Sequence, residues 1–516
     1  MLALALVLRL GDLGPPSLWL DDAWLAVGVR GDTWSERLRV VVSEPGYVLA
    51  LFAWLRAVGF SDTAAQLPAL AAGVGGVWAT MGVARRGLSM SRLASLLAGL
   101  FVATSPLHLT YSTRVKHYTL DALLTLLVLW AALAVLRRPE RPRRAVLLGV
   151  TAIAVSAVSG IVAVVAGGAL SVVVLAALAE NRRVPRQQRR HGQSAAALTA
   201  FTGVAALAAW FAFSAYWTSE VLGSTVNDVM RAEHAELFIP VDDVTAASTR
   251  LGEGANVLLN RSVAGPWPLA AALGLVGLGA VAVRRDNLDR RGGWRALLLV
   301  APVVGAIGLA AAQSAPWGLG RTELYLVPLI ALLAGAAVDV LVPSRPAGGL
   351  VLSAGRRAVG IVAASVIVTG AVVDGVGERQ SYPVEDVASA VAAWEAARTH
   401  GDGLLVYSAS RWAFGLYTSG DITLVADRAE SRGFHVEVAD VDVTLLPPTE
   451  TAGVQPALNA LDGRSRVWFL GSHRHHDWAE LTTLIREAGF VRGRAYVANG
   501  GQLIEFVRVS DAVTPE

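Results

Sequence analysis

The stretch Ser17-Leu18-Trp19-Leu20-Asp21-Asp22-Ala23-Trp24 places two adjacent carboxylates between tryptophans, directly after a first apolar segment. Neighbouring ionised carboxylates repel each other. Beside a membrane they are stable only where a cation, a proton or a reacting group offsets their charge. A solvated turn without a special role is the ordinary interpretation of such a pair. The layout of the remaining chain favours a functional role instead.

The composition indicates an integral membrane protein. Of the 516 residues, 54% are hydrophobic and 16% are charged, and the mean hydropathy is +0.50. Long apolar runs recur, each close to the roughly 20 residues that cross a ~30 Å hydrocarbon core. The chain has no cysteine, which excludes disulfides and thiolate chemistry. The net charge of +3 is small and the arginines cluster in short loops, so we expect contact with membrane lipid and no nucleic-acid partner.

Arginine clusters sort the loops between the apolar runs. If all of them face the cytoplasm, an even number of crossings separates each cluster from the next. The run Ala145–Ala179 would be ~52 Å long as one helix, so we interpret it as two helices with a turn near Ser159. The runs then predict about eleven spans with the N-terminus inside. Met1–Leu10 is too short to span by itself, and we expect it to be part of a first transmembrane helix. The other expected spans are Thr63–Ala84, Leu93–Thr104, Tyr118–Leu136, two within Ala145–Ala179, Ala195–Ala215, Trp267–Val283, Ala296–Ala312, Glu323–Val342 and Ala358–Val376.

The apolar stretch Pro45–Phe60 does not fit as a crossing. It is short, it carries Arg56, and counting it would place the arginines at 85 and 86 outside. We therefore expect a helix that lies in the membrane interface, with Trp54 at headgroup depth. Residues 11–63 are accordingly predicted to form a first outer loop with juxtamembrane helices.

The tail, residues 377–516, changes character. Apolar bursts such as Leu404–Tyr407, Val467–Leu470 and Leu503–Val507 alternate with helical patterns such as Val384–Arg398. Strand–helix alternation predicts a small α/β domain. The predicted fold class is a polytopic α-helical membrane domain over residues 1–376, followed by a soluble α/β domain over 377–516. The arginine rule places this domain on the extracytoplasmic side of a multi-pass plasma-membrane protein.

Four stretches, in order, resemble a known family. Trp19-Leu20-Asp21-Asp22-Ala23 is similar to the Trp-x-Asp-Glu-Ala motif in the first outer loop of the GT-C glycosyltransferase superfamily, in particular its family 39 protein O-mannosyltransferase-like and aminoarabinose transferase-like members. Glu44-Pro45-Gly46-Tyr47 resembles the Pro-x-Tyr juxtamembrane helix. Lys116-His117-Tyr118 resembles Arg-Pro-Tyr, and Leu324–Pro328 resembles Arg-Tyr-Leu-x-Pro. Asp22 stands where Glu is usual, and Lys116 and Leu324 stand where Arg is usual.

The resemblance covers residues 1 to 376 and implies a GT-C-like fold. It also implies transfer of a sugar from a polyprenyl-phosphate donor, with inversion, onto an extracytoplasmic acceptor that is a protein, lipid or polysaccharide. Such a displacement needs a carboxylate to take the acceptor's proton, and a cation to receive the departing phosphate. We expect Asp21 to be the general base and Asp22 to orient the acceptor, with Mg²⁺ or Mn²⁺ as a candidate cofactor on both. Candidates for binding the donor phosphate are Arg114, Lys116, His117 and Arg321, and candidates for lining the substrate pocket are Trp19, Tyr47, Tyr118 and Tyr325.

Simpler interpretations stand beside these. Arg114 and Lys116 are also typical anchors of a helix end at the headgroups, and Tyr325 is also typical of an interfacial aromatic belt. Glu323 beside Arg321 fits a plain ion pair. The stretch His473–Asp477 invites a metal site but lacks a clear ligand geometry. For the whole chain, the alternatives are a transporter or flippase for a lipid-linked or amphipathic substrate, and a catalytically inactive GT-C scaffold.

Overall fold

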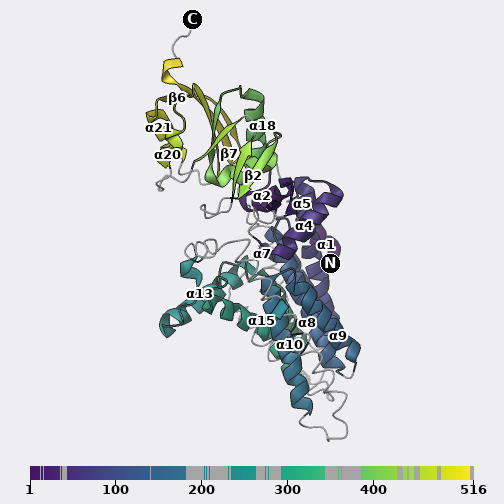
Figure 1. The fold of residues 1–516 in the computed structure, drawn as a ribbon. Coiled ribbons are helices and arrows are strands. Elements are labelled where there is room, and N and C mark those ends of the chain that lie inside the picture. Colours follow the sequence, from purple (N-terminus) through teal and green to yellow (C-terminus); the bar gives the residue numbers. More distant parts are fainter. Residues whose placement is uncertain are drawn as a thin grey trace.

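In a computed structural model, the chain folds into a long helical bundle with an α/β region stacked on one end (Figure 1). The structure describes residues 1–181, 234–262, 292–342, 385–426, 434–438, 441–446, 454–473 and 478–511, except 12, 15, 16, 35, 38–42 and 140, together with a few isolated residues elsewhere. The purple N-terminal helices lie where the bundle meets the α/β region (Figure 1).

The bundle consists of helices that differ widely in length, with η2 continuing α5 and η6 leading into α16. In chain order they are α1 (Leu2–Leu10), α2 (Leu20–Val27), η1 (Gly28–Arg30), α4 (Pro45–Val58), α5 (Asp62–Gly82), η2 (Val83–Gly87), α6 (Arg92–Thr104), α7 (Pro106–Tyr111), α8 (Tyr118–Arg137), α9 (Pro142–Ser156), α10 (Gly160–Asn181), η5 (Ala235–Leu237), α13 (Val244–Ser262), α15 (Gly292–Ala311), η6 (Leu324–Leu326) and α16 (Val327–Leu341).

Five described stretches are long and apolar enough to cross a membrane: Asp62–Gly87, Tyr118–Arg137, Gly160–Ala179, Gly292–Ala311 and Leu324–Leu341. They match five of the predicted spans in position and length, and the predicted turn within residues 145–179 is confirmed between α9 and α10. Helices α1, α6 and α9 also match predicted spans but have 9, 13 and 15 residues. The predicted spans Ala195–Ala215, Trp267–Val283 and Ala358–Val376 lie outside the described residues. The number of about eleven spans therefore stays a prediction.

The helix predicted over residues 45–60 is present as α4, and its start packs against the α9–α10 turn. At Gly46, a Cβ atom would lie 2.0 Å from the carbonyl oxygen of Ala157, so only glycine permits this approach. A similar close contact joins α16 to α6, where a Cβ on Gly335 would lie 2.9 Å from the carbonyl oxygen of Ala94. Small residues at such points let membrane helices approach closely.

The C-terminal region has the predicted α/β character. Its five-stranded sheet has the order β4-β1-β5-β7-β6, in which β1 is parallel to β4 and β5, and β7 is antiparallel to β5 and β6. The predicted boundary at residue 376 lies outside the described residues. The elements are α18 (Val387–Ala397), β1 (Gly403–Tyr407), α19 (Arg411–Tyr417), the β2–β3 hairpin (Ile422–Ala426, Phe434–Val438), β4 (Asp442–Leu446), α20 (Val454–Asn459), β5 (Arg466–Ser472), α21 (Trp478–Glu487), β6 (Phe490–Ala498) and β7 (Gly501–Arg508).

The first outer loop and the α/β region share one hydrophobic core. Leu18, Val27 and Tyr47 from the loop belong to the same buried cluster as Trp412 and Phe414 from α19. The remaining spans form a second cluster centred on α6, α8, α10 and α16. The segment with the adjacent carboxylates therefore lies at the junction between the two cores.

Candidate active site

Both carboxylates of the acidic pair lie in the first turn of α2, which follows the extended Trp19. A helix N-terminus favours negative charge. Consecutive residues on a helix point in different directions, about 100° apart. Asp22 is accordingly buried, with 1% exposure, whereas the side chain of Asp21 is 17% exposed. The two acids therefore lie in different surroundings.

Asp22 fastens α2 to the loop over residues 112–117. Its Oδ1 accepts the backbone N–H of Val115 at 2.9 Å, and its Oδ2 lies 3.3 Å from Nη1 of Arg114. Burial raises the pKa of Asp22, and the charges of Arg114 and Lys116 oppose that rise. A buried acid with these partners is suited to holding structure in place.

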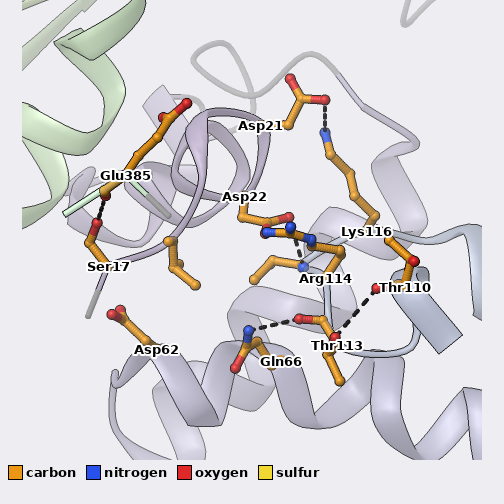
Figure 2. A network of polar contacts seen from close by, with 12 residues as sticks. Ser17, Asp21, Asp22, Asp62, Gln66, Thr110, Thr113, Arg114, Lys116 and Glu385 are labelled. Carbon is orange, nitrogen blue, oxygen red and sulfur yellow. Dashed lines mark hydrogen bonds and ion pairs between the residues drawn. The ribbon is translucent and has the colours of Figure 1, made fainter. Parts of the chain in front are cut away.

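Asp21 instead faces two cations from distant parts of the chain. Its Oδ2 lies 3.1 Å from Nη1 of Arg321 and 3.8 Å from Nζ of Lys116, a contact that Figure 2 shows. Burial lowers the pKa of Lys116, and the nearby charges of Asp21 and Asp22 oppose that shift. The structure thus brings together the predicted base and two of the predicted phosphate-binding residues.

Hydrogen bonds from neighbouring helices hold the loop that presents Arg114 and Lys116. Gln66 of α5 donates from Nε2 to the carbonyl of Thr113 at 2.7 Å, and Thr113 donates from Oγ1 to the carbonyl of Thr110 (Figure 2). The fully buried guanidinium of Arg9 donates from Nε to Ser112 Oγ at 2.9 Å. These bonds fix the loop from three helices and limit the movement of its cations.

The loop that presents Arg321 is shaped by Glu323. Its carboxylate accepts the N–H groups of Gly318 at 2.9 Å and of Gly320 at 2.8 Å. Both glycines have positive φ, 88° and 84°, which favours glycine at these positions. Burial raises the pKa of Glu323, and the hydrogen bonds to the loop backbone oppose the rise. The Glu323 carboxylate is therefore committed to the backbone, while Arg321 extends to Asp21.

His117 contacts one carboxylate and two aromatic rings. Its Nε2 is 3.6 Å from Oδ2 of Asp121, and its ring lies against those of Tyr118 (4.6 Å between centroids) and Tyr47 (5.8 Å). Burial, followed by the charges of Lys116 and Arg321, lowers the pKa of His117 to about 3. The imidazole is therefore neutral and adds no positive charge for a phosphate. A contact between His117 and the donor stays a prediction, as a hydrogen bond only.

The predicted pocket aromatics occupy different places. Trp19 has Arg114 over its ring at 5.6 Å from the centroid, and the ring of His473 lies 6.0 Å away, edge-on. Tyr47 and Tyr325 are buried inside the protein, so Tyr325 does not face lipid as a belt residue would. Tyr118 stacks edge-on against Tyr111. Their roles around a substrate stay predictions.

The described residues do not fit a metal site. Among them, no group of three or more His, Asp or Glu side chains is arranged to hold an ion. Asp21 faces Arg321 and Lys116, and Asp22 faces Arg114, so Mg²⁺ or Mn²⁺ on both acids would have to displace cations of the chain. His473 lies 2.8 Å from Glu385 through Nδ1, and Arg474–Asp477 are outside the described residues.

Comparisons with known proteins identify the architecture. No protein-family model matches the sequence, and neither does any curated protein. The structure matches ArnT from Cupriavidus metallidurans without ligand (TM-score 0.57) and bound to undecaprenyl phosphate (TM-score 0.56), each at 13% identity over 100% of this chain and 98% of that chain. It also matches an Archaeoglobus fulgidus oligosaccharyltransferase solved with zinc and sulfate, with a TM-score of 0.50 and 12% identity over 98% of this chain and 72% of that chain.

These neighbours are GT-C membrane glycosyltransferases. The chain has the GT-C fold. The match extends over the bundle and the α/β region together, and it confirms the fold that the sequence motifs suggested. With five helices among the described residues that are long and apolar enough to cross a membrane, the chain is a multi-pass membrane protein. At such low identity the likeness establishes the fold, so the roles of single residues depend on the geometry described above.

Sequence reasoning missed two features of the candidate site. Glu323 was considered only as a partner of Arg321, although the spacing Gly318-Leu319-Gly320 was a signal for a tight turn that a nearby carboxylate could cap. The buried Arg9 also escaped notice, although an arginine in an apolar helix is unusual enough to require partners.

Proposed function

We propose that this protein is an integral membrane glycosyltransferase that moves a sugar from a polyprenyl-phosphate donor to an acceptor on the extracytoplasmic side, with inversion at the sugar. The observation that carries the proposal is the approach of Asp21 to both Lys116 and Arg321. A base and two phosphate-binding cations are the groups that a single displacement requires. The bound undecaprenyl phosphate of the neighbour ArnT supports a donor of this class.

In the proposed reaction, an oxygen or nitrogen atom of the acceptor attacks the anomeric carbon from the face opposite the phosphate. Asp21 takes the proton from the attacking atom as the new glycosidic bond forms. The bond between the anomeric carbon and the phosphate oxygen breaks, and the oxygen keeps the electron pair. Lys116 and Arg321 stabilise the resulting polyprenyl phosphate.

The buried Asp22 has a positioning role in this scheme. Its bonds to Val115 and Arg114 hold α2 against the loop that carries Lys116. Arg114 is held by Asp22 and lies over Trp19, so it is a candidate for a second phosphate contact at the edge of the site. The scheme derives no step from a metal ion.

The two other function classes are not favoured. The chain shares the GT-C fold with glycosyltransferases over its full length. An inactive scaffold has no need of a carboxylate that faces two cations from separate segments of the chain. The proposed orientation places α2 and the α/β region on the extracytoplasmic side, in agreement with the arginine rule.

The test is a donor panel. Purified full-length protein in lipid nanodiscs is incubated with radiolabelled polyprenyl-phosphate sugars and with isolated membrane fractions as acceptors. We expect label to move from one polyprenyl-phosphate sugar into an acceptor, and no transfer from the corresponding nucleotide sugar. Transfer from the nucleotide sugar alone, or from none of the polyprenyl-phosphate sugars, would contradict the proposal.

A further inference from the structure

Tyr417, the last residue of α19, lies between the two ends of the first outer loop. Its phenol oxygen accepts the backbone N–H of Leu18 at 2.6 Å and donates to Oδ2 of Asp62 at 2.9 Å. Leu18 lies two residues before α2, and Asp62 is the first residue of α5. One side chain of the α/β region thus links the two ends of the loop that carries Asp21.

Further contacts from the α/β region hold the same loop. The guanidinium of Arg30, the last residue of the η1 turn that follows α2, donates to the carbonyls of Leu416 (3.2 Å), Thr418 (2.6 Å) and Gly420 (3.0 Å). A cation beside carbonyl groups at and just beyond the C-terminal end of α19 is favourable. Trp24 in the middle of α2 stacks on Trp412, with 5.1 Å between ring centroids.

The segment before α2 is fixed as well. The hydroxyl of Ser17 donates to the carbonyl of Glu385, as Figure 2 shows, and it accepts the N–H of Val387 at 3.1 Å. The α/β region therefore contacts the loop before, within and after α2. Because α2 has only eight residues, it is too short to be stable without such tertiary contacts.

The protonation state of the Tyr417 hydroxyl suits its role as a hydrogen-bond donor to Asp62. Burial raises the pKa of Tyr417, and the negative charge of Asp62 raises it further, so the hydroxyl keeps its proton at physiological pH. The negative charge of Asp22 also raises the pKa of Tyr417, by less than burial and Asp62 do. Asp62 faces the hydroxyl and gives it a fixed acceptor.

We propose that Tyr417 is a positioning residue of the candidate active site and that the α/β region, through Tyr417, helps to position the residues of that site. By joining Leu18 to Asp62, Tyr417 holds α2 in the position where Asp21 meets Lys116 and Arg321. The expected effect on transfer rests on the proposed function, whereas the effect on α2 does not. The two are therefore measured separately.

The first measurement is amide hydrogen exchange on the full-length protein in nanodiscs. Tyr417→Phe removes both hydrogen bonds and keeps the ring, so the domain core is retained. We expect peptides covering residues 18–27 to exchange about tenfold faster, with little change in the sheet. Tyr496→Phe on β6, where the side chain is 43% exposed, is the matched control and leaves exchange at α2 unchanged. Unchanged exchange at α2 in Tyr417→Phe would overturn the proposal.

The second measurement is transfer kinetics with the donor that the panel identifies. We expect Tyr417→Phe to lower kcat about tenfold, with the KM for the donor within about twofold, because the position of the base changes and the phosphate-binding loop does not. A general loss of folding would lower the active fraction in proportion to the folded fraction, which the melting curve measures. A wild-type kcat in Tyr417→Phe would overturn the role in transfer.

A double-mutant cycle separates the shared contact from independent damage. Asp62→Ala removes the acceptor and is expected to match Tyr417→Phe, whereas Asp62→Asn retains an acceptor oxygen and most of the activity. The double variant Tyr417→Phe/Asp62→Ala should be about tenfold slower than wild type rather than about a hundredfold, because both changes remove one link. Additive losses would contradict a common link. If the wild type transfers no sugar, the proposed function fails, while the exchange measurement still tests Tyr417.

Discussion

Replacing Asp21 by asparagine tests the base most directly. Asparagine retains the shape and an oxygen acceptor for Arg321, whose Nη1 lies 3.1 Å from the Asp21 carboxylate, but it cannot take a proton at neutral pH. Loss of a general base lowers kcat by about 10²–10⁴, or ~3–5 kcal/mol in the barrier. Loss of the charge that offsets Lys116 and Arg321 is expected to lower the free energy of unfolding by about 1–3 kcal/mol, which leaves the protein folded.

The assay is transfer from the polyprenyl-phosphate sugar in a single turnover, with the melting temperature measured on the same sample. Asp242→Asn is the matched control, since this exposed carboxylate precedes α13 and contributes nothing to the site. We expect Asp242→Asn to keep the wild-type rate and Asp21→Asn to lose at least 99% of it at saturating donor. An Asp21→Asn protein that keeps more than about a tenth of the wild-type single-turnover rate would refute the assignment, because that loss is smaller than general-base catalysis supplies.

Four further outcomes are expected. Arg321→Ala should raise the KM for the donor and lower kcat, so that kcat/KM falls about 10–100-fold, whereas Arg250→Ala within α13 should lower kcat/KM less. Steady-state kinetics on both variants checks this. Asp22→Ala should lower the free energy of unfolding by about 3–5 kcal/mol, because Arg114 and the Val115 N–H lose a buried partner, and a denaturant melt compares it with Asp21→Asn. Transfer is expected to persist in EDTA, since the cations that face Asp21 belong to the chain; loss of activity that Mn²⁺ restores would contradict this. Burial raises the pKa of Glu44 to about 7, so the folded protein keeps a proton that the unfolded chain releases above about 4.5. Stability should therefore fall as the pH rises from about 4.5 to 7, and Glu44→Gln should remove that part of the slope in melting curves.

The sequence predicted much of the membrane region because apolar length is a local property. The run that became α8 needs only hydrophobic residues in sufficient number, and the length of residues 145–179 required the turn that lies between α9 and α10. The strands β1, β5 and β7 were likewise predicted from short apolar bursts. Three predicted spans lie outside the described residues, so the total number rests on the arginine rule alone.

The candidate site could be predicted in its residue types but not in its pairings. The order of motifs suggested that the acidic pair and the cations at 114, 116 and 321 belong together, and the structure brings them together. Which acid faces which cation depends on the rotation of α2, and this rotation is set by contacts with α19. Tyr417 is far from Leu18 in sequence, and no local pattern marks it as a partner. Such contacts depend on the tertiary fold, and the hydrophobic periodicity of the sequence does not predict them.

The separate surroundings of the two acids explain how adjacent carboxylates can serve one reaction. Asp22 is committed to Val115 and Arg114, so in the proposed reaction it would keep α2 in place throughout a turnover. Asp21 shares Lys116 and Arg321 with the phosphate that the proposed donor would bring. On binding, that phosphate would compete for the same cations and leave Asp21 without its ion-pair partners. The base would then become free to accept a proton only when the donor is in place, so the cation pair would couple donor binding to activation of the acceptor.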